Sequence, residues 1–147
     1  MVLPYTDLQV TSNFSFLRGA SHPEELVQEA AALGHTCIAI TDHNTLAGIV
    51  RAHVEAKKTG IRLIIGCHLV LQDGPDLLAY PTDKEAYARL STMLSEGNLR
   101  TEKGQCLLYK KDVYQYKKGI KFIAIPPYQL NEHFDFDTGF KNDLREY

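Results

Sequence analysis

Short apolar runs alternate along the chain with longer segments in which apolar residues recur every three to four positions. This alternation is typical of βαβ units and a parallel sheet. "CIAI" within residues 36–41 is an almost continuous apolar run, as expected for a parallel strand covered on both faces. The pattern predicts strands over 7–11, 36–41, 61–71 and 120–125, a return strand over 77–81, and helices over 20–35, 46–60 and 82–97.

Local signals place the ends of these predicted helices. Ser21 with Glu24 forms a capping-box pattern, and Thr82 with Glu85 repeats it. Asn44 or Thr45 can cap the helix between them. Three glycines, Gly34, Gly60 and Gly97, are the expected stops. Residues 98–119 mix turns, tyrosines and lysines, and the final "NDLREY" looks helical without a cap or a stop.

Polar side chains follow two of the predicted parallel strands. Asp42 and His43 end one strand, and His68 follows "IIGC" in the next. Groups at the carboxyl ends of parallel strands gather at one edge of a sheet, where Gln9 and Thr11 could join them. A carboxylate beside imidazoles suits metal or phosphate chemistry. Two histidines are few for zinc, and Asp42 could equally cap backbone amides of the following helix, with His43 an exposed loop residue.

Composition narrows these possibilities only slightly. The 147 residues are 44% hydrophobic and 23% charged, which predicts a folded domain with one core. The formal charge of -2 provides no general attraction to nucleic acid. Three cysteines without C-x-x-C spacing fit a reducing compartment, and no apolar run approaches the ~20 residues of a membrane span, so we expect a cytoplasmic protein.

The segment "LYKKDVYQYKKGIK" interleaves tyrosines with lysines. Such a mixture can stack bases and contact phosphates of single-stranded DNA. A solvated lysine surface above a tyrosine-rich core explains it equally well. The candidate DNA contacts are Tyr109, Lys110, Lys111, Tyr114, Tyr116, Lys117 and Lys118.

Four segments together resemble a known family: "NFSFLRGASHPEELV", "AITDHNTLAGIV", "LIIGCHL" and "CLLYKKDVYQY". They are similar to the N-terminal PHP (polymerase and histidinol phosphatase) domain of bacterial DNA polymerase III alpha subunits of the error-prone, damage-tolerant type. The resemblance runs from about Tyr5 to the end of the chain. It implies an α/β fold that is part of a distorted β/α barrel with parallel strands, truncated and not closed. Residues 5–100 would form its βα core, and residues 101–147 a segment that ends within an element.

The family carries a cluster of metal ligands at its strand ends, which serves phosphoester hydrolysis or proofreading in active members. This chain departs from that pattern at most positions. The opening H-x-H falls on Gln9 and Thr11, the aspartate before Gly-Ala on Arg18, and the glutamate after Gly-Cys on His68. His43 matches, with Asp42 before it, and Asp76 lies near the position of another family histidine.

Arg18 is the departure with the clearest physical meaning. A guanidinium is permanently charged and cannot act as a ligand, so Arg18 would substitute for the metal in a polar network with Asp42 and His43. We therefore expect no cofactor. Zinc or manganese, held by His43 and His68, would be present only in an active enzyme.

Two functional hypotheses follow. The first is the PHP-domain portion of an error-prone DNA-directed DNA polymerase, a nucleotidyltransferase of DNA replication and damage-induced repair, with this portion non-catalytic and structural. Its partners would be the remainder of the polymerase, other replication or repair subunits, and DNA; unpaired sheet edges could also support self-association. The second is a metal-dependent phosphoesterase or 3'-5' exonuclease that uses His43, His68 and Asp76.

Overall fold

The computed structural model describes residues 5–130, 132, 133, 135, 136 and 138–146. The chain forms two compact units, residues 1–68 and 69–147. Both units contain helices and strands, which confirms the predicted α/β class. Within the described ranges, the strands of neither unit close into a barrel, as expected.

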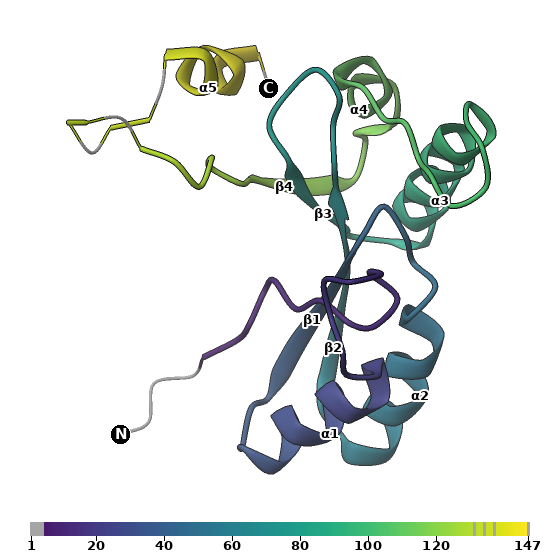
Figure 1. The fold of residues 1–147 in the computed structure, drawn as a ribbon. Helices are drawn as coiled ribbons and strands as arrows, with labels where there is room; N and C mark the ends of the chain where they lie inside the picture. The colour runs from purple at the N-terminus through teal and green to yellow at the C-terminus, as the bar shows by residue number, and fades with distance from the viewer. Residues whose placement is uncertain (1–4, 131, 134, 137, 147) are drawn as a thin grey trace. The chain divides into compact units, whose positions relative to one another are not determined.

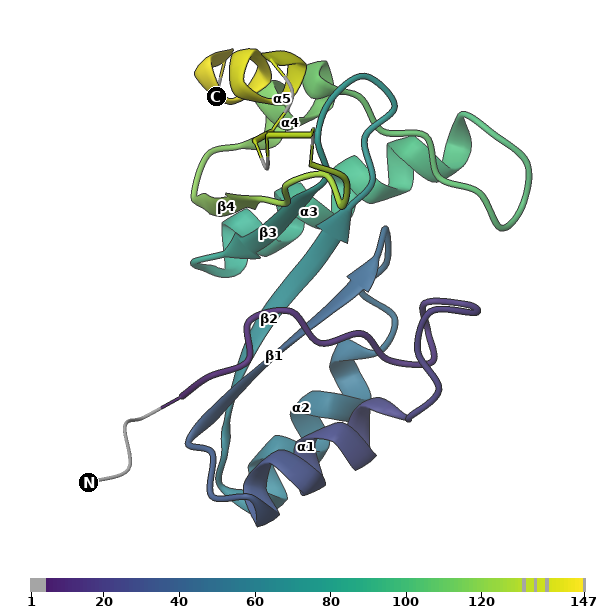
Figure 2. The same ribbon diagram turned by 60° about the vertical axis from the view of Figure 1, so that its left-hand side comes forward.

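The first unit is built from two helices and two parallel strands (Figure 1). Residues Cys37 to His43 of β1 lie opposite residues Arg62 to His68 of β2, one for one. The two helices lie beside each other along these strands (Figure 2). In chain order the elements are α1 (Pro23–Ala32), β1 (Cys37–His43), α2 (Ile49–Thr59) and β2 (Arg62–Leu69).

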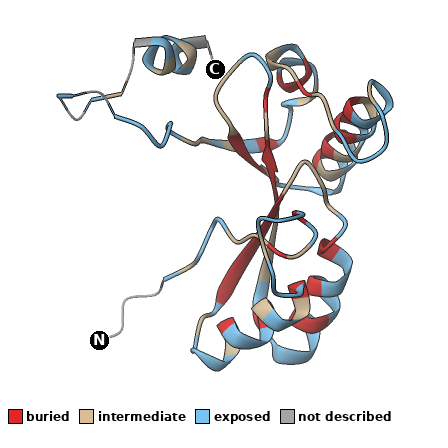
Figure 3. Ribbon diagram, viewed as in Figure 1, coloured by how far each residue is buried: buried red, intermediate tan, exposed pale blue. Residues whose placement is uncertain are grey.

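The core of this unit lies between the helices and one face of the strands. Ile38 and Ile40 lie two positions apart on β1, so both side chains are on that face, as the two-residue period of a strand requires. Val27 of α1 and Ala52 of α2 meet them and are fully buried. Almost the whole of β1 is buried (Figure 3), which matches its continuous apolar sequence.

The predicted first strand over 7–11 is wrong as a regular strand, although the segment does bond to β1. The carbonyls of Asp7 and Val10 accept hydrogen bonds from the amides of Ala39 (2.9 Å) and Thr41 (2.8 Å). The acceptors are three residues apart and the donors two, so the spacing breaks a continuous ladder. The segment contacts the edge of β1 without becoming a third regular strand of this unit.

Several predicted helix starts are displaced. The capping box of α1 is formed by His22 and Glu25, one residue after the expected pair. Asn44 has φ of 52°, a left-handed conformation, and α2 begins only after its N-cap Gly48. At α3, Asp83 accepts from the amide of Ala86 at 2.7 Å.

The second unit combines an antiparallel strand pair with helices. The predicted return strand is β3, and its residues Leu77 to Pro81 run antiparallel to Ala124 back to Ile120 of β4. The final helical prediction is confirmed through Glu146; Tyr147 lies outside the described residues. The elements are β3 (Leu77–Pro81), α3 (Lys84–Leu99), α4 (Lys110–Tyr116), β4 (Ile120–Ala124), α5 (Thr138–Asp143) and the 3-10 helix η1 (Leu144–Glu146).

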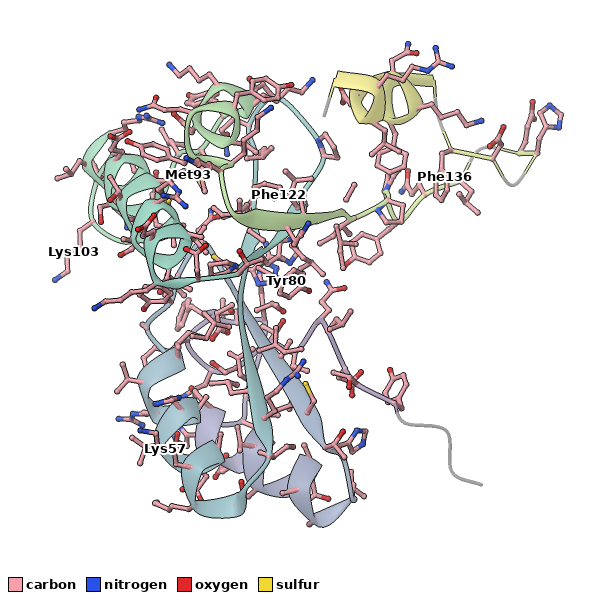
Figure 4. All side chains as sticks on the ribbon, turned by 180° about the vertical axis from the view of Figure 1, so that it is seen from behind. Lys57, Tyr80, Met93, Lys103, Phe122 and Phe136 are labelled. Carbon is pink, nitrogen blue, oxygen red and sulfur yellow. The ribbon has the colours of Figure 1, made fainter. Side chains whose placement is uncertain are left out.

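Gly97 was expected to end a helix, but it lies inside α3 at a close contact. A Cβ there would sit 2.7 Å from the sulfur of Cys106 and from a methyl of Leu108. The amide of Leu107 also donates to the Gly97 carbonyl at 3.0 Å. The glycine therefore lets the segment after the helix pack directly on its backbone. Met93, one turn earlier, is buried, whereas Lys103 points to solvent (Figure 4).

In the part of the chain that the structure describes, none of the helices has the length and apolar character of a membrane span.

Candidate functional site

The strand-end residues predicted from the sequence lie together in the first unit. His43 is the last residue of β1 and faces His68 of β2 in the parallel register. Asp42, one position earlier, is opposite Cys67, whose thiol donates to the Asp42 carbonyl at 3.4 Å. The parallel register therefore places the carboxylate and both imidazoles at neighbouring positions.

The Asp42 side chain is enclosed by hydrogen-bond donors from the preceding loop. The amide of Ser12 donates to Oδ1 at 2.8 Å, and its hydroxyl donates to Oδ2 at 2.7 Å. Ser15 Oγ donates to Oδ1 at 2.6 Å. Asp42 is only 2% exposed. Both carboxylate oxygens are thus used within the protein, in short charge-assisted hydrogen bonds.

This arrangement excludes one sequence interpretation of Asp42. The helix that follows begins seven residues later, at Ile49, and the donors to the carboxylate come from residues about thirty positions before it. Asp42 is therefore not an N-cap of α2, and His43 belongs to β1 instead of an exposed loop. Ser15 also accepts from the His43 amide at 2.9 Å, so one hydroxyl connects the two residues.

The two histidines form a stacked pair. Their ring centroids are 4.0 Å apart and the ring planes differ by 28°. Nδ1 of each ring is buried. Across the described residues, the structure has no group of three or more His, Cys, Asp or Glu side chains arranged to hold a metal ion. The pair is thus too small for a zinc site of the usual kind.

The polar network forms without Arg18. Its side chain is exposed, and its backbone amide donates to the Ser15 carbonyl at 2.9 Å. The expectation that Arg18 joins Asp42 and His43 is therefore wrong: the turn after Ser15 directs it outward. Gln9 is exposed and Thr11 is half-buried. Asp76 belongs to the second unit, where its carbonyl accepts from the Ile125 amide at 2.8 Å.

Ser12 and Ser15 are the site residues that sequence reasoning missed. Their spacing of three in "TSNFS", next to the segment aligned with family ligands, was the available signal. Gly19 shows how tightly the loop closes, since a Cβ there would lie 2.4 Å from the Ser12 carbonyl oxygen. Gly48 is similarly enclosed, with Asp42 Oδ2 3.0 Å from the position of a Cβ.

A separate pocket of about 440 Å³ lies at the opposite ends of the two strands. Cys37 and Arg62, the first residues of β1 and β2, contribute to it. It therefore does not coincide with the Asp42 site. Its lining is Thr6, Leu8, Thr36, Cys37, Arg62 and Ile64.

The tyrosine and lysine segment of the second unit forms the short helix α4, which sequence reasoning did not predict. Lys110 pairs with Asp143 at 2.5 Å, and the Tyr116 hydroxyl donates to Glu96 at 2.5 Å. That hydrogen bond raises the pKa of Tyr116. Lys111 and Lys117 lie 5.5 and 5.6 Å from the ring centroids of Tyr109 and Tyr114. Of the four candidate lysines, three are exposed: Lys111, Lys117 and Lys118.

A partly buried ion pair holds this helix. Arg100 donates to both carboxylate oxygens of Asp112, at 2.5 and 2.8 Å, and Asp112 is 2% exposed. The guanidinium lowers the pKa of the Asp112 carboxyl. Asp112 also accepts from the Tyr109 amide at 2.9 Å and so caps the helix start. Arg100 therefore neutralises the negative charge of the buried Asp112 carboxylate.

Comparison with known proteins identifies the family. Residues 7–147 match the family described as PHP domain, and the chain belongs to this family. Within it, the chain is similar to proteins named error-prone DNA polymerase. It is 50% identical over 143 residues to one from Caulobacter vibrioides and 48% identical over 131 residues to one from Rhodopseudomonas palustris. The resemblance to the error-prone type is thus confirmed.

The chain spans a small part of these relatives. The matches cover 96% and 86% of this chain but only 13% and 12% of the two polymerases.

Solved structures show a related fold. An amidohydrolase from Chromobacterium violaceum, with bound sulfate and no metal, has a TM-score of 0.55 at 27% identity. A protein assigned as a metal-dependent phosphoesterase from Bifidobacterium adolescentis has 0.54 at 28%. Each similarity covers 64% of this chain and 33% of the other.

Proposed function

We propose that the chain is the PHP-domain portion of an error-prone DNA polymerase and that this portion is structural, without a reaction of its own. The polymerase assignment is supported by the two relatives, which match nearly the whole chain. The parent enzyme would catalyse DNA synthesis in replication and damage repair, in the cytoplasm, through parts of the polymerase outside this segment.

The hydrogen bonds of the Asp42 carboxylate are the observation that supports the structural role. A carboxylate that binds a cation needs lone pairs directed at open space, and the groups that hydrogen-bond to such a carboxylate normally leave those lone pairs available. Here a backbone amide and two hydroxyls already occupy both oxygens. The carboxylate instead holds the Ser12 loop against β1. The residues present thus do not fit a metal centre.

Metal analysis together with a hydrolysis assay tests this proposal. The purified chain, loaded with zinc or manganese and then desalted, should retain well below one metal ion per chain. It should hydrolyse bis(p-nitrophenyl) phosphate no faster than the variant His43→Ala. His53→Ala, at an exposed position on α2, is the matched control. Stoichiometric metal, with turnover that His43→Ala abolishes and His53→Ala preserves, would overturn the proposal.

The second candidate is a metal-dependent phosphoesterase or 3'-5' exonuclease. The stacked His43–His68 pair at the strand ends favours it, as does the resemblance to the Bifidobacterium adolescentis protein. The two imidazoles would then bind the metal; Asp76, the third residue of this hypothesis, belongs to the second unit. An end-labelled oligonucleotide distinguishes the two activities, because an exonuclease shortens it from its 3' end whereas a small-molecule phosphoesterase leaves it intact.

The partners of the structural module would be the rest of the polymerase, other replication or repair subunits, and DNA. Direct DNA contact would use the exposed lysines and tyrosines around α4. Self-association through unpaired strand edges is a further prediction, since such edges can pair with another copy. Size-exclusion chromatography with light scattering tests it, and a monomer at high concentration would count against it.

A further inference from the structure

The loop from Ser12 to Gly19 exposes two large apolar side chains in succession. Phe16 is 84% exposed and Leu17 is 88% exposed. Arg18 follows them and is exposed as well. We refer to Phe16, Leu17 and Arg18 as the loop tip. Adjacent apolar side chains with nearly full exposure on a folded unit commonly indicate a contact with another surface.

The backbone at the loop tip is strained. The Ser15 carbonyl accepts from the Arg18 amide at 2.9 Å, so Phe16 and Leu17 are the central residues of a tight turn. Leu17 has φ of 61°, in the left-handed region. Turns with this conformation at their third residue normally have glycine or asparagine there, because a Cβ is unfavourable. The side chain of Leu17 is not buried within this unit, so the packing of the unit does not explain why a leucine occupies this strained position.

The base of the same loop is fixed. Ser12 and Ser15 are bonded to the buried Asp42 carboxylate, and Gly19 packs against the Ser12 backbone. Phe14, closer to the base, has Arg51 5.8 Å from its ring centroid. The tip is therefore presented on an ordered support. A side chain held in place before binding loses less entropy when it docks.

We propose that the loop tip docks into an apolar pocket with an acidic rim on the remainder of the full-length polymerase. This inference rests on the proposed function. In the Caulobacter vibrioides relative, 13% of the polymerase corresponds to this chain, so most of such an enzyme lies outside it. Phe16 and Leu17 would enter the pocket, and a carboxylate at its edge would pair with Arg18. Aromatic and arginine side chains at an ordered centre are typical of contacts that dominate an interface.

The local charge favours protein over DNA as the occupant. Affinity for DNA depends on several lysines or arginines near the phosphates. Arg18 is the single Lys or Arg between residues 5 and 50, and residues 1–68 contain six acidic and five basic side chains. Leucine also lacks the ring that base stacking requires. The loop tip therefore has the composition of a protein contact.

Thiol labelling of a chimera tests the inference. This chain replaces the matching segment of the Caulobacter vibrioides polymerase, and Leu17→Cys is introduced both there and in the 147-residue chain alone. Alkylation at position 17, followed by mass spectrometry, should be about tenfold or more slower in the chimera, because a covered thiol reacts only when the contact opens. Leu33→Cys is the matched control, since Leu33 is also exposed (68%) but lies at the end of α1.

The outcomes separate this inference from the proposed function. A chimera that extends a primer but labels position 17 as fast as the isolated chain would overturn the loop-tip contact alone. A chimera without primer extension counts against the proposed function, whatever the labelling shows. Protection that requires added primer-template DNA, or that appears in the isolated chain as its concentration rises, would assign the tip to DNA or to a second copy and refute the docking proposal.

Discussion

Asp42 is a buried carboxylate whose neighbours determine its role. Its position was predictable, because an acid after a continuous apolar strand belongs at the carboxyl end of a parallel sheet. Its donors were not, since serines are common and Ser12 lies thirty residues away. Arg18 was predicted to join Asp42 because it aligns with a ligand position of the family, but that alignment does not include the turn after Ser15, which directs Arg18 outward.

Replacement of Asp42 measures the strength of this network. Asp42→Asn keeps the shape but removes the charge and turns one acceptor into a donor that faces Ser12 or Ser15. We expect the free energy of unfolding to fall by about 3 kcal/mol, because hydrogen bonds to a charged group contribute about 1.5–3 kcal/mol each and are not additive. Urea denaturation measures it. Asp7→Asn, at an exposed position, is the control, and a loss no larger than the control's would contradict the network's importance.

Leu17 provides a second test at this scale. Leu17→Gly removes the strained left-handed leucine. We expect it to raise the free energy of unfolding of the isolated chain by about 0.5–1 kcal/mol, because the strain that is relieved exceeds the entropic cost of folding the more flexible glycine. Leu33→Gly, where φ is -75°, should lower it. Thermal and urea unfolding give both values. Destabilisation by Leu17→Gly equal to that of Leu33→Gly would show that the turn is unstrained.

At the scale of elements, hydrophobic periodicity predicted the long helices and the main strands, because their apolar faces dominate the sequence. Boundaries moved by one to several residues where a neighbouring side chain could cap equally well, as at His22 and Asp83. Helix α4 has only seven residues and no local signal strong enough to predict it. Contacts from Arg100 and Glu96, distant in sequence, stabilise it.

The Arg100–Asp112 pair makes the stability of α4 depend on pH. Arg100 holds the pKa of folded Asp112 below its ordinary value of 3.8. The stabilisation is therefore complete above the unfolded pKa and is lost as the pH falls through the folded one. Asp112→Asn should lower the free energy of unfolding by roughly 2 kcal/mol at pH 7, since Asp112 is buried and Arg100 partly exposed.

The difference between wild type and Asp112→Asn should shrink as the pH falls below about 4, because the carboxyl of the unfolded chain is protonated first and the folded carboxyl, whose pKa is lower, only at more acidic pH. Glu85→Gln is the control, because Glu85 forms a long 3.9 Å contact with Arg89 at the surface and its loss should have little effect at any pH. Urea denaturation from pH 7 to pH 3 measures both variants. An effect of Asp112→Asn that does not change with pH would contradict the ion-pair explanation.

At the scale of the whole molecule, the α/β class followed from the alternation of elements, and the unclosed strands followed from the resemblance to part of a longer family domain. The assignment to error-prone polymerases depended on combined motifs and not on any single one. Periodicity could not indicate that the chain divides after residue 68, because the strand predicted over residues 61–71 continues across that point.

DNA binding through the tyrosine and lysine segment of the second unit would depend on its exposed lysines. Lys110 pairs with Asp143, which leaves Lys111, Lys117 and Lys118 among the candidate lysines to contact phosphate. If they do, replacing all three with glutamine should reduce the slope of log affinity against log salt by about 0.7 per lost phosphate contact on single-stranded DNA. Fluorescence anisotropy at several salt concentrations measures the slope. Lys57→Gln, on the outer face of α2 (Figure 4), is the control. Salt-independent or absent binding would remove this surface as a DNA site.

The bonds between Asp42 and the serine loop also set an order for folding. A contact across thirty residues cannot form early, because closing that length of chain is unfavourable until other contacts have formed. The carboxylate comes into position only when β1 pairs with β2, so the strands should form before the loop closes on them. Ser12→Ala should then speed unfolding with little effect on the folding rate, a φ-value near zero, in stopped-flow experiments. A value near one would place the loop in the folding nucleus.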